Sequence, residues 1–270
     1  MKDMAEFKKA WRSKAMNCRI GTTSYIIPGD IIPNLQFLKH AVENIELVIF
    51  DSDGRSNLPS KSSILEMSII ARDTGLTFTV HLPANPHAGS TRETKRKQGV
   101  EKWLKIMDRM ESLLPMGWIV PLRKNCLPPE QWCTEQWAQR CGKTIDALSG
   151  AAEPESLCIE RTALACAAAE YLVDETNCSV CIDIGYMLRT GHDIHACLEK
   201  WFDRTRIIHL HGVRSDGRDH VDLGHMETDL LDSLCSGLKN GGGTPRILTL
   251  DLFSRKDLER SMHVLQEVIH

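Results

Sequence analysis

The stretch Cys181-Ile182-Asp183-Ile184-Gly185-Tyr186 places an acidic residue inside an apolar run. The apolar residues from Val180 to Ile184 are typical of a buried strand. A carboxylate inside such a strand is costly unless a cation or hydrogen-bond donors receive it. Asp183 is therefore predicted to be a site residue.

Three other apolar runs end in the same way, with a Glu, His or Asp at or near the last position. They are Leu157 to Glu160, Ile207 to His211, and Ile247 to Asp251. Four strands that each carry such a residue near the C-terminal end describe a metal centre or an acid/base centre at one end of a parallel barrel.

The rest of the chain alternates strands with helices. Strand starts recur at intervals of roughly 30 residues, the repeat of a (β/α)8 barrel and not of an open, doubly wound sheet. The sequence therefore predicts an α/β fold, a single (β/α)8 TIM barrel over residues 19–270 preceded by an N-terminal extension over residues 1–18. The expected strands are 19–27, 45–50, 77–82, 118–122, 157–160, 180–184, 206–210 and 246–250, and the expected helices are 31–42, 62–74, 100–114, 129–148, 164–174, 194–202, 227–238 and 256–268.

Charge and composition exclude several classes of protein. The 33 basic and 36 acidic residues give a net charge of -3, which disfavours a nucleic-acid partner or a membrane surface and suits a neutral or small anionic substrate. Residues 1–18 contain no signal-peptide core and no run that could span a bilayer, so we expect a cytoplasmic protein. The ten cysteines are scattered, mostly in apolar segments, and are predicted to be reduced and structural.

Four residues are predicted to bind a divalent cation. Glu160, Asp183, His209 and Asp251 come from consecutive strands of the barrel and should converge on one point. Carboxylates and an imidazole suit zinc or manganese and leave positions open for water or a substrate oxygen. The alternative is that each residue only caps its strand or pairs with a neighbouring arginine.

Other polar residues are candidates of lower rank. His81 ends the third strand and His220 lies after the seventh, although a single His at a strand end is more often structural. His211 shares a strand face with His209 and should also point to the centre. Asp51 suits a substrate hydroxyl, but it is equally good turn chemistry.

The strand ends Ile-Glu-Arg-Thr, Ile-Asp-Ile-Gly, Ile-His-Leu-His and Leu-Asp-Leu-Phe resemble those of the xylose-isomerase-like barrels, a superfamily that includes endonuclease IV. Within it, Gly21-Thr22-Thr23-Ser24-Tyr25-Ile26-Ile27-Pro28-Gly29-Asp30-Ile31-Ile32-Pro33-Asn34, followed by Glu46-Leu47-Val48-Ile49-Phe50, resembles the cobamide-remodelling phosphodiesterases. This resemblance implies metal-dependent hydrolysis of the nucleotide loop of a cobamide substrate, giving cobinamide phosphate and an α-riboside of the lower-ligand base.

The resemblance also implies site residues. It assigns the metal to Glu160, Asp183, His209 and Asp251. We also expect Glu160 to be catalytic, and we expect His81 or His220 to protonate the departing ribose oxygen, because an imidazole has a pKa near neutral pH. The segment from Thr22 to Pro33 follows the first strand and is therefore expected on the catalytic side, where it should shape the pocket, with Thr23 and Tyr25 binding substrate. The alternative is a loop that only packs.

The chain also departs from endonuclease IV. Tyr186 stands where that enzyme has a His, Pro121 offers no His on the fourth strand, and the loop after the seventh strand reads Arg218-Asp219-His220. These departures favour one or two metal ions over three, and the lack of a basic face disfavours DNA cleavage.

Two other functions remain open. The first is a sugar isomerase or epimerase of the same superfamily, in which the resemblance implies proton transfer by two Glu residues on the fifth and eighth strands. Here the residue on the eighth strand is Asp251, whose side chain is one methylene shorter than Glu. The second is a protein that binds a cobamide without converting it. The sequence leaves the native metal and the oligomeric state open.

Overall fold

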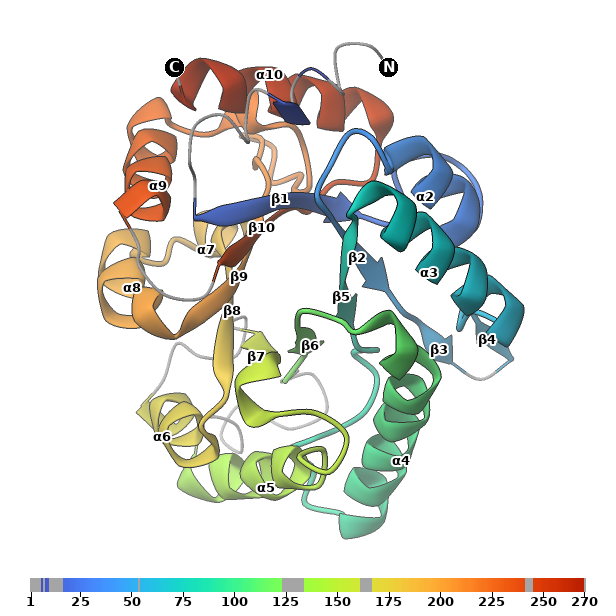
Figure 1. Ribbon diagram of the computed structural model, residues 1–270. Coiled ribbons are helices and arrows are strands. Elements are labelled where there is room, and N and C mark those ends of the chain that lie inside the picture. Colours follow the sequence, from blue (N-terminus) through green and yellow to red (C-terminus); the bar gives the residue numbers. More distant parts are fainter. Residues whose placement is uncertain are drawn as a thin grey trace.

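Eight parallel strands close into a barrel in the computed structural model of the protein (Figure 1). Neighbours around the barrel follow the order of the chain, and the last strand pairs with the first. This confirms the predicted (β/α)8 barrel. The strands are β1 (Cys18–Thr23), β2 (Asn44–Val48), β5 (Thr77–His81), β6 (Trp118–Val120), β7 (Leu157–Glu160), β8 (Ser179–Asp183), β9 (Thr205–Leu210) and β10 (Arg246–Leu250).

The structure describes residues 6, 8–9, 17–52, 54–122, 134–160, 167–240 and 245–269. The predicted N-terminal extension falls almost entirely outside these ranges, as do the first residues of the helices predicted at 129–148 and 164–174. The extension therefore stays a prediction.

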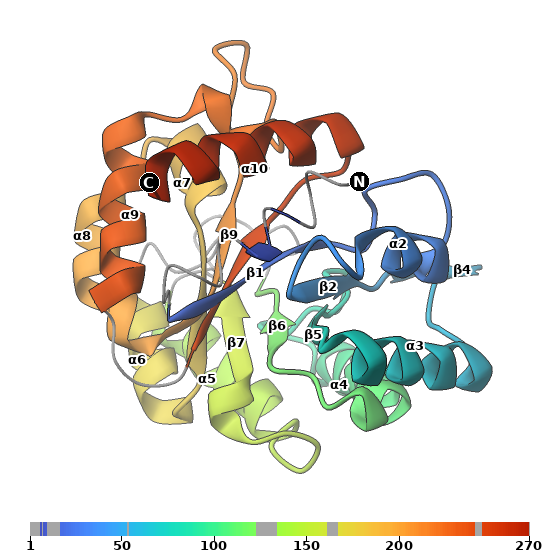
Figure 2. The same ribbon diagram turned by 45° about the horizontal axis from the view of Figure 1, so that its top comes forward.

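Helices surround the barrel on its outer side, and Figure 2 shows the same ring from a second direction, with α10 beside α9. Helix α3 illustrates the local signals, because the Ser60 side chain accepts a hydrogen bond from the Ser63 amide at its start and Gly75 ends it at φ 69°. The helices are α2 (Ile31–Leu38), α3 (Lys61–Thr74), α4 (Glu93–Met110), α5 (Glu135–Asp146), α6 (Ala167–Thr176), α7 (Ile184–Thr190), α8 (Ile194–Trp201), α9 (Thr228–Asn240) and α10 (Arg255–Ile269).

Several features differ from the sequence-based expectation. The first strand ends at Thr23 and not at residue 27, and the first helix ends at Leu38 and not at residue 42. Helix α4 begins at Glu93 and not at residue 100, because its first turns are polar and give no hydrophobic period. Residues predicted as a loop after β2 form a small hairpin of β3 (Asp51–Ser52) and β4 (Arg55–Ser56). Helix α7 follows Asp183 without a loop, in a region where no helix was expected.

The core has two parts. Most buried apolar side chains pack between strands and helices, whereas a small separate cluster contains Ile119, Cys158, Cys181, Ile207 and Ile247. Side chains two residues apart on a strand share a face, so four of these five lie on the same strand faces as the predicted site residues that follow them. The barrel therefore holds an apolar layer beneath its polar end.

Two further expectations concern cysteines and membranes. Seven cysteines in the described part of the chain are buried and are not joined by disulfides: Cys18, Cys141, Cys158, Cys178, Cys181, Cys197 and Cys235. No described helix combines the length and the apolar character needed to cross a membrane.

Candidate metal centre

A cavity of about 480 Å³ opens at the C-terminal ends of the barrel strands. Such a position is where TIM-barrel enzymes carry their active sites. Its described lining consists of Glu46, Val48, His81, Leu122, Glu160, Asp183, Tyr186, Arg189, His211, Asp219, His220, Asp251 and Phe253.

Three of the four predicted metal ligands form a compact buried group. Glu160, Asp183 and His209 end or nearly end β7, β8 and β9, and their candidate ligand atoms all lie within 4.8 Å of one another. The pairing of Asp183 with His209 across β8 and β9 sets this proximity. Asp251 follows β10, and its Oδ2 lies 4.0 Å from His209 Nδ1. Two or three carboxylates and one imidazole fit a divalent cation such as zinc or manganese.

His209 forms a hydrogen bond with Glu46, a buried residue of β2 that was not predicted as a site residue. His209 Nε2 donates to Glu46 Oε2 at 2.9 Å, and Thr249 Oγ1 donates to the same oxygen at 3.3 Å. Burial alone would raise the pKa of Glu46, but the charge and hydrogen bond of His209 lower it overall. This bond engages Nε2 and leaves Nδ1 of His209 for a cation.

Asp183 both ends β8 and starts α7. Its side chain accepts a hydrogen bond from the Tyr186 amide at 2.8 Å, the bond of a helix N-cap. Burial raises the pKa of this carboxyl, but hydrogen bonding from His211 and the charge of His209 outweigh burial, so its pKa is lowered. A carboxylate that stays ionised is suited to bind a metal.

His81 lies on the other side of Glu160. Its Nδ1 donates to the Leu82 carbonyl at 2.9 Å, and its Nε2 lies 3.4 Å from Glu160 Oε1. Burial would lower the pKa of His81, but the hydrogen bond and charge of Glu160 and the charge of Glu46 raise it to about 9. In the absence of a metal, His81 and Glu160 therefore form an ion pair at neutral pH.

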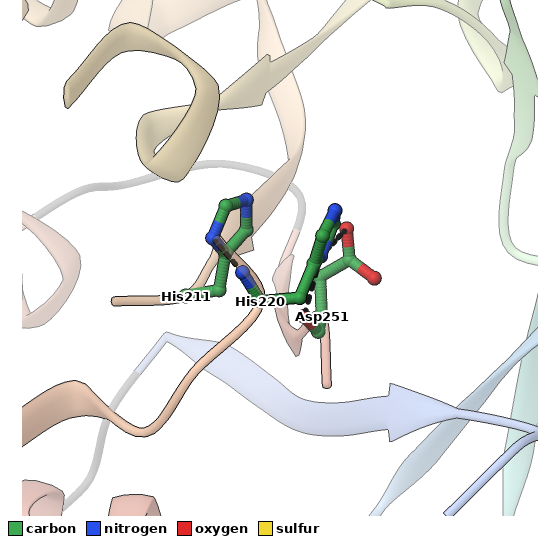
Figure 3. A group of neighbouring side chains, drawn as sticks. All are labelled: His211, His220 and Asp251. Atoms are coloured by element: carbon green, nitrogen blue, oxygen red, sulfur yellow. Dashed lines mark hydrogen bonds and ion pairs between the residues drawn. The ribbon is translucent and has the colours of Figure 1, made fainter. Parts of the chain in front are cut away.

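His211, His220 and Asp251 form a second group, whose candidate ligand atoms also lie within 4.8 Å of one another (Figure 3). The two imidazole rings stack with centroids 4.1 Å apart. His220 Nδ1 donates to the Asp251 carbonyl at 3.0 Å, and His220 has φ 52°. Burial raises the pKa of Asp251, and the charges of Glu46 and Asp183 add to this effect. The predicted residues His211 and His220 thus lie in the cavity with the predicted ligands.

Three residues predicted to bind substrate are not among the described residues that line the cavity. Thr23 is buried, and its hydroxyl donates to the Leu252 carbonyl at 2.6 Å. The Tyr25 hydroxyl accepts a hydrogen bond from the side-chain amide of Asn57. Asp51 belongs to the β3–β4 hairpin, where its backbone carbonyl accepts from Asn85 and Lys102. Substrate binding by Thr23, Tyr25 and Asp51 therefore stays a prediction.

Six lining residues besides Glu46 were not predicted: Val48, Leu122, Tyr186, Arg189, Asp219 and Phe253. Tyr186 and Arg189 come from α7, which the sequence analysis did not foresee. Arg189 Nη1 donates to Asp219 Oδ2 at 2.5 Å, and its guanidinium lies 5.4 Å from the centre of the Tyr186 ring. Phe253 packs its ring edge-on against His220, with centroids 5.1 Å apart.

Similar solved structures span nearly the whole chain at low sequence identity. A D-tagatose 3-epimerase-like protein superposes with a TM-score of 0.72 at 16% identity, covering 93% of this chain and 97% of its own. A 3-keto-D-glucoside 4-epimerase from E. coli superposes with a TM-score of 0.67 at 12% identity, covering 93% of this chain and 98% of its own. A probable 3-DHS dehydratase from Bacillus anthracis superposes with a TM-score of 0.63 at 10% identity, covering 93% of this chain and 97% of its own. At these identities the likeness establishes the fold alone.

The sequence itself matches one family. A search of the curated proteins gave no match. The family described as "Xylose isomerase-like TIM barrel" matches residues 38–267, which includes seven of the eight barrel strands and all four predicted metal ligands. The chain therefore belongs to the xylose isomerase-like TIM barrel family.

Proposed function

We propose that the protein is a metal-dependent phosphodiesterase that cleaves the nucleotide loop of a cobamide. The observation that carries this proposal is Arg189, the only Lys or Arg among the described residues that line the cavity. The lining also contains five carboxylates, and a guanidinium among them can bind a phosphate group of the substrate, since Arg donates two parallel hydrogen bonds to phosphate oxygens. The resemblance of residues 21–34 to the cobamide-remodelling enzymes supports the same substrate.

Glu160, Asp183, His209 and Asp251 would hold the cation. A bound divalent cation lowers the pKa of water and neutralises charge on a phosphoryl oxygen. Arg189 would bind a second phosphoryl oxygen once that oxygen replaces Asp219 as its partner. These residues would together fix the phosphodiester between the ends of the strands.

His220 is suited to protonate the leaving group. Its Nδ1–H is committed to the Asp251 carbonyl, so Nε2 is the atom that can exchange a proton with the substrate. His81 is less free, because its Nε2 faces Glu160. In this reaction the oxygen of water would bond to phosphorus and release a proton to the solvent, the bond from phosphorus to the ribose oxygen would break, and His220 would give that oxygen a proton. The products would be cobinamide phosphate and the α-riboside of the lower-ligand base.

The test is to incubate the manganese- or zinc-loaded protein with adenosylcobalamin in ¹⁸O-water and to analyse the products by mass spectrometry. The label is expected in the phosphate of cobinamide phosphate. Cobinamide without phosphate, or cobyric acid, would contradict the proposed bond. Binding of the cobamide without any product would identify a binding protein instead.

Arg189→Ala and Arg189→Lys form a matched pair for the phosphate assignment. The Ala variant should raise the KM for adenosylcobalamin by about tenfold or more, and the Lys variant should recover part of that loss because it keeps the charge without the fork. An unchanged KM in both variants would remove Arg189 from the proposal.

A sugar epimerase is the second candidate, and two observations favour it. Glu160 and Asp251, on β7 and after β10, both line the cavity, and two carboxylates on opposite sides of a carbon can remove and return its proton. The similar structures named for epimerases also lie closer to this activity than to the first proposal. Conversion of a ketose by a protein that leaves adenosylcobalamin intact would select it.

A further inference from the structure

His211 is a buried residue of the cavity lining, beside the candidate metal ligand Asp183. It directly follows β9, its side chain is 1% exposed, and its ring stacks on that of His220 (Figure 3). Its two nitrogens face different partners, Asp183 on one side and the loop that carries His220 on the other. The hydrogen bonds at these nitrogens decide what the residue can do.

The proton of the His211 ring can be assigned from a backbone donor. The His220 amide donates to His211 Nδ1 at 3.0 Å, and an amide N–H can only donate. Nδ1 must therefore present its lone pair, which places the proton of the neutral ring on Nε2. The Gly212 carbonyl lies 3.2 Å from Nδ1, but a carbonyl only accepts and cannot be the partner of a lone pair.

The protonated Nε2 of His211 faces Asp183 Oδ1 at 3.4 Å. The same oxygen accepts the Tyr186 amide at 2.8 Å. Two donors on Oδ1 leave Oδ2 of Asp183 as the oxygen available to a cation. A proton on Nε2 also prevents His211 from binding the cation itself, although its nitrogen lies near His220 and Asp251.

Gly185 provides the space that this arrangement needs. A Cβ at position 185 would lie 2.1 Å, 2.3 Å and 2.3 Å from three atoms of the His211 ring, closer than any contact between real side chains. The ring therefore lies directly on the backbone of the residue two positions after Asp183. The sequence Asp183-Ile184-Gly185 thus contains both the candidate metal ligand Asp183 and the glycine that leaves room for the ring of His211.

We propose that His211 is a positioning residue that fixes the Asp183 carboxylate for metal binding, and that Gly185 admits its ring. This proposal rests on the metal centre of the proposed function but not on the identity of the substrate. Outer partners of this kind orient a ligand and typically contribute 10- to 100-fold in metal affinity.

The test measures Co²⁺ binding to the metal-free protein by calorimetry, by visible absorption spectra and by metal analysis after dialysis. His211→Leu should weaken Co²⁺ binding about 10- to 100-fold and alter the spectrum, with the same number of ions bound at saturation. His211→Gln should recover part of the affinity, because its amide can still donate to Asp183.

Three results would overturn the proposal. A loss of one bound ion per chain in both variants would make His211 a ligand. Unchanged affinity in His211→Leu would remove its role, and so would a wild-type protein that binds no Co²⁺. A wild-type protein that binds Co²⁺ but leaves adenosylcobalamin intact would refute the proposed function without touching this inference.

Gly185→Ala gives an independent measurement through a double-mutant cycle with His211→Ala. In the wild-type background, the added methyl group should displace the ring and weaken Co²⁺ binding as His211→Leu does. In the His211→Ala background, the same methyl group should change the affinity by less than about twofold, because the ring is gone. Equal losses in the two backgrounds would show that the contact between Gly185 and His211 is not the cause.

Discussion

At the scale of single residues, Glu160 has the largest predicted effect because it faces both the candidate ligand group and His81. Glu160→Gln keeps the volume of the side chain but removes its charge. We expect metal affinity and activity to fall by about 100-fold or more, since a ligand should cost at least as much as an outer partner. Metal analysis and turnover measure this, with the exposed Glu66→Gln on α3 as the control. Full metal content and turnover in Glu160→Gln would refute the assignment.

The ion pair of His81 with Glu160 predicts a pH-dependent stability of the metal-free protein. The pKa of His81 is raised to about 9 in the folded chain, above the usual 6.5. Its contribution is therefore fully present below about pH 6.5 and is lost as the pH rises through about 9. Between these pH values, wild type should lose about 2 kcal/mol more unfolding free energy than His81→Gln. Urea unfolding measures both proteins, and parallel losses would contradict the ion pair.

At the scale of elements, the loop after β1 is fastened by the buried side chain of Asn34. Its Oδ1 accepts from the amides of Ile26 and Ile27 at 2.8 Å and 2.9 Å, and its Nδ2 donates to the carbonyls of Ile27, Gly29 and Asp30. The segment that resembles the cobamide enzymes thus owes its shape to a side chain of α2. The roles of Thr23 and Tyr25 in substrate binding stay a prediction beside this account.

Asn34→Ala should lower the unfolding free energy by about 2–3 kcal/mol, because two backbone amides lose their acceptor away from water. Thermal or urea unfolding measures the loss, and Co²⁺ affinity should stay within about twofold, because no candidate ligand contacts Asn34. Gln36→Ala, on the exposed side of the same helix, is the control. A loss in Asn34→Ala no larger than that of Gln36→Ala would show that the loop does not depend on these bonds.

The same scale explains what the sequence could predict. The barrel strands were predictable because each is a short apolar run, and the candidate ligands because each is a polar residue at the end of such a run. Glu46 matches the pattern used for Asp183, an acidic residue inside an apolar run, since it lies within Ile45-Glu46-Leu47-Val48; applying that pattern to the second strand would have found it. Helix α7, with Tyr186 and Arg189, was hidden because seven residues give too little hydrophobic period to detect.

Contacts that depend on tertiary structure could not be predicted. Nothing local in the sequence pairs His211 with Asp183, or Arg189 with Asp219, because these partners meet only when the strands are placed side by side. The hydrogen bonds of the Thr23 and Tyr25 hydroxyls could not be predicted for the same reason. Their partners, Leu252 and Asn57, are distant in the chain.

At the scale of the whole molecule, the candidate ligands connect one half of the barrel. They come from β7, β8 and β9 and from the residue after β10, so a cation would join strands that are contributed by residues 157–251. A ligand that binds only the folded state stabilises it by RT ln(1 + [L]/Kd), or about 2.7 kcal/mol at a hundredfold excess over Kd. The melting temperature should then rise by roughly 5–10 °C for a chain of this size.

Hydrogen exchange should locate this stabilisation. Protection should increase most in β7 to β10 and least in β2 and β5, because only the former carry candidate ligands. Differential scanning calorimetry with and without a chelator gives the matching shift of the melting temperature, with Glu160→Gln as the control that lacks one ligand. If the metal raised the melting temperature of Glu160→Gln as much as that of wild type, or protected β2 and β5 equally, the cation would be binding elsewhere on the protein.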